Sequence, residues 1–388
     1  MKIFHTADWH LGKLVQGVYM TDDQRYVIDQ FLEAIDEEQP DAIIIAGDLY
    51  DRPVPPAAAI TLLDETLSKI VTERQIPLFA IAGNHDSPTR IHFGSSLMRN
   101  AGLHITGELQ QTIEPIILED EFGEVHFHLI PFAEPSIVKE VHQDETIKTY
   151  DEAMEKVTRE IVKTLDPNAR HIAVAHAFVT THGQKEENTS DSERPLAIGG
   201  SECVHAQYFE PFHYTALGHL HRAHYVAQEK IRYSGSLLKY SSSEATQQKG
   251  YLIVNLNGDG AVEVEKRLFN PLRDLRIVEA TLQELLKHET SEDYVFVRLT
   301  DNTPVVGAME QIRTVYPNAM HVERKAIRTE LEQQEHTVSR EKLDDRTLFK
   351  SFYEQMAGKE MTSSVEKLFN DVLQQMLEEE REKQEVRG

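Results

Sequence analysis

The sequence of 388 residues has a single cysteine, Cys203, and no apolar run long enough to cross a membrane. One cysteine excludes a disulfide within the chain and is typical of a reducing compartment, so we expect Cys203 to be a packed residue rather than a nucleophile. A membrane-spanning helix needs about 20 apolar residues, and a signal peptide needs an apolar segment near the N-terminus. Because neither pattern is present, the sequence predicts a cytoplasmic protein.

Positive charge is also scarce. The chain has 40 lysines and arginines against 65 aspartates and glutamates, which gives a formal net charge of −25. Nucleic-acid binding usually depends on many basic contacts to phosphates, and the overall charge does not favour it. If the chain acts on phosphates, the positive charge that binds them must be concentrated at a local site. A chain of this length can bury a substantial core and is expected to form two or three domains.

The sequence does contain five short polar motifs, each following an apolar stretch with strand character. The stretches are 2–5, 42–45, 78–82, 172–174 and 214–217. The motifs are Asp8-Trp9-His10, Gly47-Asp48-Leu49-Tyr50-Asp51, Gly83-Asn84-His85-Asp86, Ala175-His176 and Gly218-His219-Leu220-His221. Any one motif could be a hydrogen-bonded structural feature. In an open α/β sheet, however, ligands collect at the carboxyl ends of strands, so the five motifs together predict one crevice.

This mixture of carboxylate, imidazole and amide side chains predicts a site for two divalent metal ions. Asp48 is the natural bridging ligand, because it has two oxygens and lies at the centre of the motif series. The expected terminal ligands of one metal are Asp8, His10 and His221. Those of the other metal are Asn84, His176 and His219. The set lacks thiolates, which argues against a structural zinc site; we expect Mn²⁺, with iron or zinc as alternatives.

His85 is not needed as a ligand. Its position between Asn84 and Asp86 would place its ring beside a scissile phosphate, where it could protonate the leaving oxygen as a general acid. Asp51 or Asp86 could orient that imidazole and so contribute to catalysis. For both acids the alternative is structural, because an aspartate just before a helix is often only an N-cap.

The order of the motifs resembles that of the calcineurin-like metallophosphoesterase superfamily. Within it, four stretches are similar to the SbcD family of bacterial nuclease subunits, and the similarity extends over most of the first two thirds of the chain. The four stretches are 5–12 (HTADWHLG), 46–53 (AGDLYDRP), 216–222 (ALGHLHR) and 232–236 (RYSGS).

The resemblance implies a manganese-dependent DNA phosphodiesterase, with 3′ to 5′ exonuclease activity on duplex ends and endonuclease activity on hairpins or single strands. It implies work in DNA repair, recombination and replication together with an SMC-like ATPase, SbcC. Its metal ligands correspond to the seven residues already chosen, and its general acid corresponds to His85. Where several relatives outside the bacteria carry a histidine, this chain has Asp51, so the role of Asp51 stays open.

The expected mechanism is attack on the phosphodiester by a hydroxide held between two metals, with His85 protonating the departing oxygen. Relatives form homodimers through helices beside the active site, and 57–70 with 91–101 are the corresponding segments here. Basic residues near the motifs could line a DNA groove, although an ordinary solvated surface is an equally good interpretation of each. They are Lys13, Arg25, Arg52, Arg90, Arg99 and Arg222. We expect weak DNA binding by the isolated chain.

Residues 1–268 predict the catalytic domain, an α/β (α+β) two-sheet sandwich flanked by helices. Amphipathic helices are expected over 23–38, 57–73 and 151–165, and later strands over 231–234, 251–256 and 262–268. The polar segment 181–200 predicts a loop near the metal edge or a plain exposed connection.

A small α/β domain is predicted over 271–329, with strands over 274–279, 294–299 and 320–326 and helices starting at Leu282 and Val306. In relatives such a cap contacts DNA, but a merely stabilising role is also open. A polar linker over 330–342 and a helical region over 343–388 follow. The apolar stripes of that region could pack back on the catalytic domain; we prefer docking on the coiled coil of the ATPase, as in relatives. The stripes comprise Leu348, Phe349, Phe352, Met356, Val365, Leu368, Phe369, Val372, Leu373, Met376 and Leu377.

Two other functions remain open at this point. A metal core alone does not distinguish substrates, so a phosphatase or a small-molecule phosphodiesterase is the first alternative. The second is a non-catalytic interaction subunit that positions an ATPase on DNA. A complete set of seven ligands disfavours the second alternative.

Overall fold

The computed structural model describes residues 1–183, 202–301, 303–324, 349–350, 353, 361–370 and 372–373. The chain divides into two compact units, Met1–Lys325 and Ala326–Gly388, and each is described by itself. Most of the loop expected over 181–200, the linker expected over 330–342 and most of the C-terminal region lie outside the described residues. Residues Leu348, Phe352, Met356, Met376 and Leu377 of the predicted stripes are among those left out.

The first sheet has six strands, four of them parallel. In order across the sheet they are β16 (Val262–Leu268), β15 (Gly250–Leu256), β1 (Lys2–Thr6), β4 (Ala42–Ile45), β5 (Leu78–Ile81) and β6 (Leu103–Thr106). Strands β1, β4, β5 and β6 pair in parallel, and β15 runs antiparallel to both β1 and β16. Successive residues of a strand point to opposite faces, so Ile43 and Ile44 enter different cores. Burial on both faces explains why these strands are continuously apolar.

The second sheet also has six strands, with parallel pairing in its centre. In order they are β13 (His224–Val226), β14 (Gln228–Tyr233), β12 (Tyr214–Gly218), β9 (Arg170–His176), β8 (Gly123–Ile130) and β7 (Ile116–Asp120). Strands β8, β9, β12 and β14 are parallel, while β13 and β7 close the two edges in antiparallel orientation. The sequence predicts three of these six strands, β9, β12 and β14.

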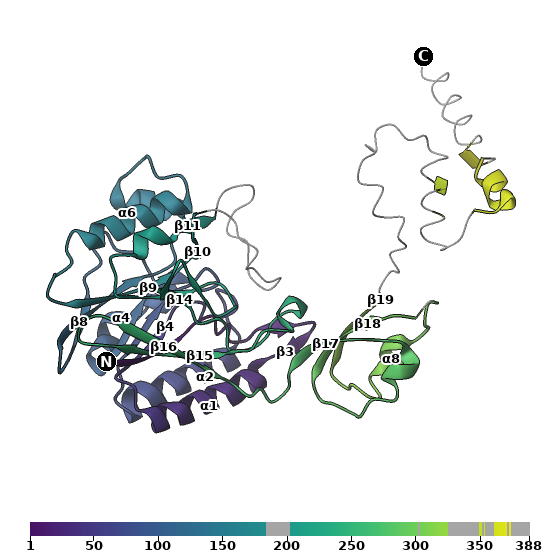
Figure 1. The fold of residues 1–388 in the computed structure, drawn as a ribbon, viewed down its shortest axis with the longest axis horizontal. Helices are drawn as coiled ribbons and strands as arrows, with labels where there is room; N and C mark the ends of the chain where they lie inside the picture. Colours follow the sequence, from purple (N-terminus) through teal and green to yellow (C-terminus); the bar gives the residue numbers. More distant parts are fainter. Residues whose placement is uncertain are drawn as a thin grey trace, which may run out of the picture. The chain divides into compact units, whose positions relative to one another are not determined.

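The two sheets pack face to face, with helices on both outer faces (Figure 1). Between the sheets, Phe79 of the first stacks on Phe127 of the second at 4.1 Å between ring centroids. Helices α1 (Thr21–Glu38) and α2 (Ala57–Ser68) cover the first sheet, and a π-helical turn, Lys69–Glu73, extends α2. Helices α5 (Pro135–His142) and α6 (Tyr150–Val162) cover the second sheet. The predicted two-sheet sandwich is therefore confirmed.

Short elements complete this region. They are β2 (Leu14–Val15), β3 (Val18–Tyr19), α3 (Pro88–His92), α4 (Ser95–Met98), β10 (Phe178–Thr180) and β11 (Cys203–His205). Cys203 is buried in the core beneath α6, in agreement with the packed role expected of it. No helix among the described residues is long and apolar enough to cross a membrane.

A small α/β segment follows within the same unit. Its parallel strands are β17 (Leu275–Ala280), β18 (Tyr294–Leu299) and β19 (Ala319–Arg324), joined through α7 (Leu282–Leu285) and α8 (Ala308–Ile312). The alternation predicted from the sequence is confirmed. The segment has a hydrophobic core of its own, and it is joined to α1 through the buried Asp23. That carboxylate pairs with Arg273 at 2.7 Å and accepts a hydrogen bond from the Tyr294 hydroxyl at 2.8 Å.

A chain of histidines lies in and beside the second sheet, with His128 in β8, His171 near the start of β9 and His213 just before β12. The Nε2–H of His171 donates to Asp166 O at 2.8 Å, so its Nδ1 accepts from Nε2 of His128 at 3.1 Å. His213 Nδ1 accepts the backbone N–H of His171 at 2.9 Å. The remaining His128 nitrogen, Nδ1, is buried without a hydrogen-bond partner among the described residues. Burial lowers the pKa of His128 from 6.5 to about 3.

This histidine makes stability depend on pH. Because the folded pKa is lowered, the unfolded chain binds more protons below pH 6.5, and stability falls as the pH falls from 6.5 towards 3. The loss approaches about 1.4 kcal/mol per pH unit for one histidine. We expect His128→Phe to remove this loss, so that its unfolding free energy falls less between about pH 7.5 and about pH 5.5 in urea titrations. The exposed control His321→Phe should keep the wild-type difference, and an equally steep fall in His128→Phe would contradict the assignment.

Candidate metal centre

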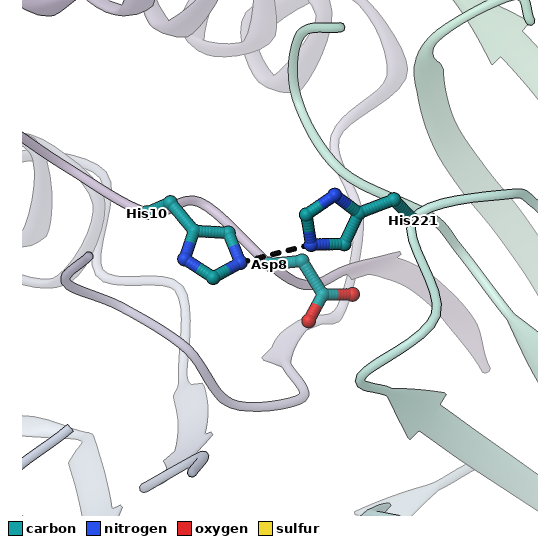
Figure 2. Close-up of side chains that lie close together, drawn as sticks. All are labelled: Asp8, His10 and His221. Atoms are coloured by element: carbon teal, nitrogen blue, oxygen red, sulfur yellow. Dashed lines mark hydrogen bonds between the residues drawn. The ribbon is translucent and has the colours of Figure 1, made fainter. Parts of the chain in front are cut away.

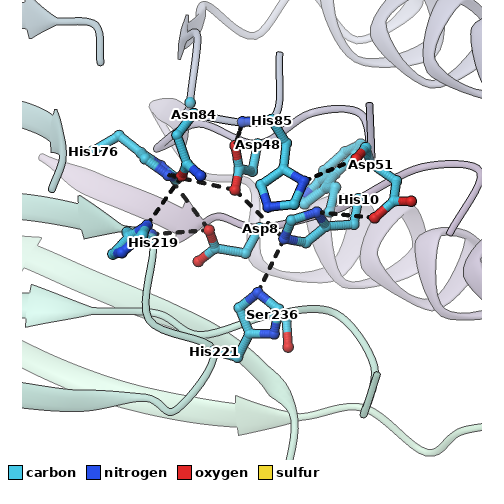
Figure 3. A network of polar contacts seen from close by, with 12 residues as sticks. Asp8, His10, Asp48, Asp51, Asn84, His85, His176, His219, His221 and Ser236 are labelled. Atoms are coloured by element: carbon cyan, nitrogen blue, oxygen red, sulfur yellow. Dashed lines mark hydrogen bonds and ion pairs between the residues drawn. The ribbon is translucent and has the colours of Figure 1, made fainter. Parts of the chain in front are cut away.

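The predicted site residues meet at the carboxyl ends of five parallel strands. Asp8 and His10 follow β1, Asp48 and Asp51 follow β4, Asn84 and His85 follow β5, His176 ends β9, and His219 and His221 follow β12. The loops after β1 and β4 are bonded together, because Asp8 N donates to Gly47 O at 3.0 Å and His10 N donates to Asp48 O at 2.9 Å. Both sheets thus contribute to one buried cluster (Figure 3).

Four of these residues have left-handed backbone angles. The φ angles of Asp8, His10 and Asp48 are 53°, 45° and 52°, and that of His219 is 107°. Such angles are uncommon in residues other than glycine, cost about 1–3 kcal/mol each and concentrate at functional sites. Gly47 and Gly83 allow the loop after β4 and the loop after β5 to approach each other closely. A Cβ on Gly83 would lie 2.2 Å from Asp48 Oδ1.

One group of side chains consists of Asp8, His10 and His221 (Figure 2). The Nε2 atoms of the two histidines lie 3.0 Å apart, and all three residues are buried. Asp8 Oδ1 accepts the backbone N–H of His219 at 2.9 Å, which ties the loop after β12 to the loop after β1. This group is the predicted ligand set of the first metal.

A second group consists of Asn84, His176 and His219. Asn84 Oδ1 lies 2.9 Å from His176 Nε2 and 3.0 Å from His219 Nδ1. Asp48 lies between the two groups, because its Oδ2 is 3.5 Å from His10 Nε2 and 3.4 Å from His176 Nε2. The structure therefore brings all seven predicted ligands together and places Asp48 between the two groups (Figure 3).

Several ligand atoms of the cluster face one another at hydrogen-bond distance. Nδ1 of His176 donates to Ala46 O at 2.9 Å, so a neutral His176 ring presents its Nε2 lone pair to Asn84 Oδ1 and the Asp48 carboxylate, whereas a charged ring presents a proton. Oδ2 of Asp8 is buried and accepts no hydrogen bond from a described residue. Buried lone pairs that converge are unfavourable unless a positive charge lies between them. The donor set thus fits divalent cations.

The pKa values show the same demand for positive charge. Burial raises the pKa of the Asp8 carboxyl group to about 6 and lowers that of the His219 imidazole to about 3. Burial also opposes a charge on His176, but the adjacent Asp48 carboxylate outweighs it and raises the pKa of His176 to about 9. Burial likewise opposes ionisation of Asp48, yet His176 holds the pKa of Asp48 well below its usual range. The centre of the cluster favours a cation beside Asp48.

His85 lies at the edge of the cluster with its ring held by the backbone. Its backbone N–H donates to Asp48 Oδ1 at 2.8 Å, and its Nδ1 is 2.8 Å from the carbonyl oxygen of Asp51. Because a carbonyl only accepts, Nδ1 carries a proton and donates it. The Asp51 carboxylate has another contact, an ion pair with Lys13 at 2.7 Å. Asp51 therefore orients the His85 imidazole through its backbone rather than its side chain.

Asp86 supports the loops behind the site. Its Oδ1 accepts the backbone N–H of Tyr50 at 2.9 Å, and its Oδ2 accepts those of Gly83 at 2.9 Å and Leu49 at 3.1 Å. The carboxylate thus joins the loop that carries Asp48 to the loop that carries His85. It is not an N-cap either, because Ser87 occupies the N-cap position of α3.

Sequence reasoning missed the residues that hold the ligands from behind. Gln24 of α1 donates from Nε2 to the carbonyl oxygens of His10 at 2.8 Å and Trp9 at 3.1 Å. The Glu244 carboxylate lies 3.3 Å from His221 Nδ1 and pairs with Lys249 at 2.5 Å. Burial opposes ionisation of Glu244, but Lys249 outweighs it and holds the pKa of Glu244 below its usual range. Neither Gln24 nor Glu244 belongs to a motif that could have revealed it.

Comparison with known proteins agrees with this geometry. The family model described as calcineurin-like phosphoesterase matches residues 1–223, which is more than half of the chain. The fold and the site thus define a calcineurin-like phosphoesterase, a metal-dependent hydrolase of phosphate esters. A second family model, described as type 5 capsule protein repressor C-terminal domain, matches residues 271–357.

A curated relative narrows the family further. The SbcD subunit of the nuclease SbcCD from Staphylococcus epidermidis is 36% identical over 366 residues, which cover 93% of this chain and 95% of that protein. The chain therefore belongs to the SbcD family of nuclease subunits.

Similarity to solved structures is much lower. A dimetal phosphatase from Danio rerio is 9% identical, covers 69% of this chain and 96% of its own, and has a TM-score of 0.40. GAP50, the anchor in the inner membrane complex of Plasmodium, is 10% identical, covers 83% of this chain and 96% of its own, and has a TM-score of 0.38. These likenesses are too low to support a conclusion about function.

The contacts of Asp86 predict a large structural effect. Asp86→Ala leaves three backbone N–H groups in two loops without their acceptor, and each buried unsatisfied group costs about 1–3 kcal/mol. We expect the unfolding free energy in urea to fall by about 3 kcal/mol. The control Asp64→Ala removes an exposed carboxylate of α2 and should change stability little. Equal stability of the two variants would show that Asp86 does not join the loops.

Proposed function

We propose that this chain is the nuclease subunit of a DNA-processing complex, with manganese-dependent 3′ to 5′ exonuclease activity on duplex ends and endonuclease activity on hairpins or single strands. The observation that supports this most directly is the single buried cluster formed by all seven predicted ligands, with His85 at its edge. A cytoplasmic role in DNA repair, recombination and replication accompanies this proposal. It extends to this chain what the name of its staphylococcal relative says of that nuclease.

In this proposal Asp8, His10 and His221 would hold one metal, and Asn84, His176 and His219 would hold the other. Asp48, which lies between the two groups, would be a ligand of both. Imidazole and carboxylate ligands without thiolate are suited to Mn²⁺. Two such ions, when bound, lower the pKa of the attacking water and neutralise charge on the phosphate.

Residues of the chain donate the proton and hold the proton donor in place. His85 donates a proton from Nε2 to the leaving oxygen, because its Nδ1–H is already engaged by Asp51 O. The hydrogen bond from the backbone N–H of His85 to Asp48 Oδ1 fixes the distance between the general acid and the ligand cluster. Lys13 pairs with the Asp51 carboxylate at 2.7 Å, beside the backbone carbonyl that holds the His85 ring. No covalent enzyme intermediate is needed.

DNA binding and partner choice are the finer parts of the proposal. With a net charge of −25, the chain alone is expected to bind DNA weakly and to act with an SMC-like ATPase of the SbcC type. Exposed apolar side chains in the C-terminal unit support a docking role, because Leu368 is 65% exposed and Val372 is 46% exposed. The α/β segment that begins at 271 is proposed to cap the DNA.

The catalytic roles can be separated by mutation. His85→Ala should lower manganese-dependent release of nucleotides from end-labelled duplex DNA by about a hundredfold or more, because it removes only the proton donor. Its bound manganese, measured by atomic absorption, should equal that of the wild type. Asp48→Ala should lose both activity and metal, whereas His321→Ala, an exposed control, should lose neither.

Two results would oppose these assignments. Loss of metal in His85→Ala would make His85 a ligand rather than the acid. If the wild type released no nucleotides even with the ATPase and ATP, the substrate would be another phosphoester.

We also propose a homodimer formed through the segments 57–70 and 91–101. Both expose large apolar side chains, since Phe93 is 85% exposed, Leu97 is 80% exposed and Ile60 is 47% exposed. Exposed apolar groups of this size typically mark contact surfaces. Leu97→Asp should convert a dimer to a monomer in sedimentation-velocity runs. Leu14→Asp, which changes an exposed leucine of β2, should remain dimeric; a wild-type monomer would refute the proposal.

A further inference from the structure

Glu244 is a fully buried carboxylate behind the metal centre. It ends the short 3₁₀ turn Ser242–Glu244, far from the five motifs in the sequence. Its Oε1 lies 3.3 Å from Nδ1 of His221, on the side of the ring that faces away from His10. A buried carboxylate is costly unless it is paired, so its place behind a ligand requires an explanation.

Lys249 holds Glu244 and His221 together. Its ammonium group lies 2.5 Å from Glu244 Oε2 and donates to the backbone carbonyl of His221 at 2.8 Å. It also donates to Gln247 Oε1 at 2.7 Å. The lysine thereby fixes the carboxylate relative to the main chain that carries the His221 ring.

The carboxylate determines how His221 presents its other nitrogen. An ionised carboxylate only accepts hydrogen bonds, so the imidazole must carry its proton on Nδ1, leaving the lone pair on Nε2. That Nε2 points into the ligand cluster, 3.0 Å from His10 Nε2. Carboxylates behind a ligating histidine fix the ring and raise its basicity, and their loss typically weakens metal binding by about 10–100-fold.

We propose that Glu244 is a positioning residue that fixes His221 as a ligand of one of the two metals. The inference rests on the proposed ligand role of His221. The other half of the cluster is held differently, because Nδ1 of His176 donates to the backbone carbonyl of Ala46 in the loop after β4. Loss of Glu244 therefore weakens one metal site and leaves the other intact.

The test is a titration of the metal-free full-length chain with Mn²⁺ by isothermal calorimetry. The wild type should bind two ions. Glu244→Gln, which keeps the size and removes the charge, should bind one ion with wild-type affinity and the other about 10–100-fold more weakly. At the manganese concentration that fills both wild-type sites, the wild type should show the electron paramagnetic resonance signal of a spin-coupled manganese pair. Glu244→Gln should lack that signal at the same concentration.

Glu124→Gln is the matched control. Glu124 also pairs with a histidine, at 2.7 Å from His126 Nε2, but it lies outside the metal centre. This variant should bind both ions as the wild type does. The double variant His221→Ala, Glu244→Gln should bind manganese no more weakly than His221→Ala alone, since two residues that act through one ligand are not additive.

Three outcomes would overturn the assignment. They are unchanged binding of both ions by Glu244→Gln, equal weakening of both ions, and a further loss in the double variant. A wild type that binds fewer than two ions would instead refute the proposed metal ligands. Urea unfolding of the metal-free variants measures any general loss of folding, because Glu244→Gln removes the charge that pairs with the buried Lys249 ammonium group.

Discussion

Asp48 lies where two groups of buried acceptor atoms meet, and the repulsion among those atoms constrains the rest of the site. One of its oxygens is within 3.5 Å of a histidine nitrogen from each group. Water cannot relieve the repulsion, because Asp48 and both histidines are almost completely buried. Positive charge is what stabilises such an arrangement, either as an imidazolium at His176 or as a cation. The metal chemistry of the family is therefore a consequence of how these side chains are packed.

The fold provides the rigid support that this packing needs. Parallel strands from two sheets end at one edge, and hydrogen bonds between the loops after β1 and β4 fix Asp8 and His10 against Gly47 and Asp48. The left-handed backbone angles of Asp8, His10 and Asp48, which are not glycines, cost free energy that the buried sandwich core must offset. The strain is tolerated because the loops leave strands that are buried on both faces.

The sequence predicts which side chains meet in the cluster, because each of them follows an apolar strand and the carboxyl ends of parallel strands lie at one edge of a sheet. It predicts the supports poorly, because they come together only through tertiary packing. Glu244 lies in a serine-rich stretch, and Gln24 lies on an amphipathic helix, where a polar residue would ordinarily face solvent. The orienting group at His85 is the backbone of Asp51, which no side-chain pattern can reveal. Strand β7 was missed for a related reason, because it is half exposed at a sheet edge and its sequence is partly charged.

The same supports tie one half of the cluster to the α/β segment that begins at 271. Gln24, which holds the His10 loop, is adjacent to Asp23, and Asp23 pairs with both Arg273 and Tyr294. Lys239 forms a second connection, because it donates to the backbone oxygen of Ala245, the residue after Glu244. It also donates to the backbone oxygen of Leu275 and pairs with Asp274. A cavity of about 360 Å³ lies beside these contacts. The Asn84 half of the cluster lies on the core of the sandwich. The α/β segment is therefore connected through Asp23 to the helix whose Gln24 holds the His10 loop, and through Lys239 to the turn that carries Glu244.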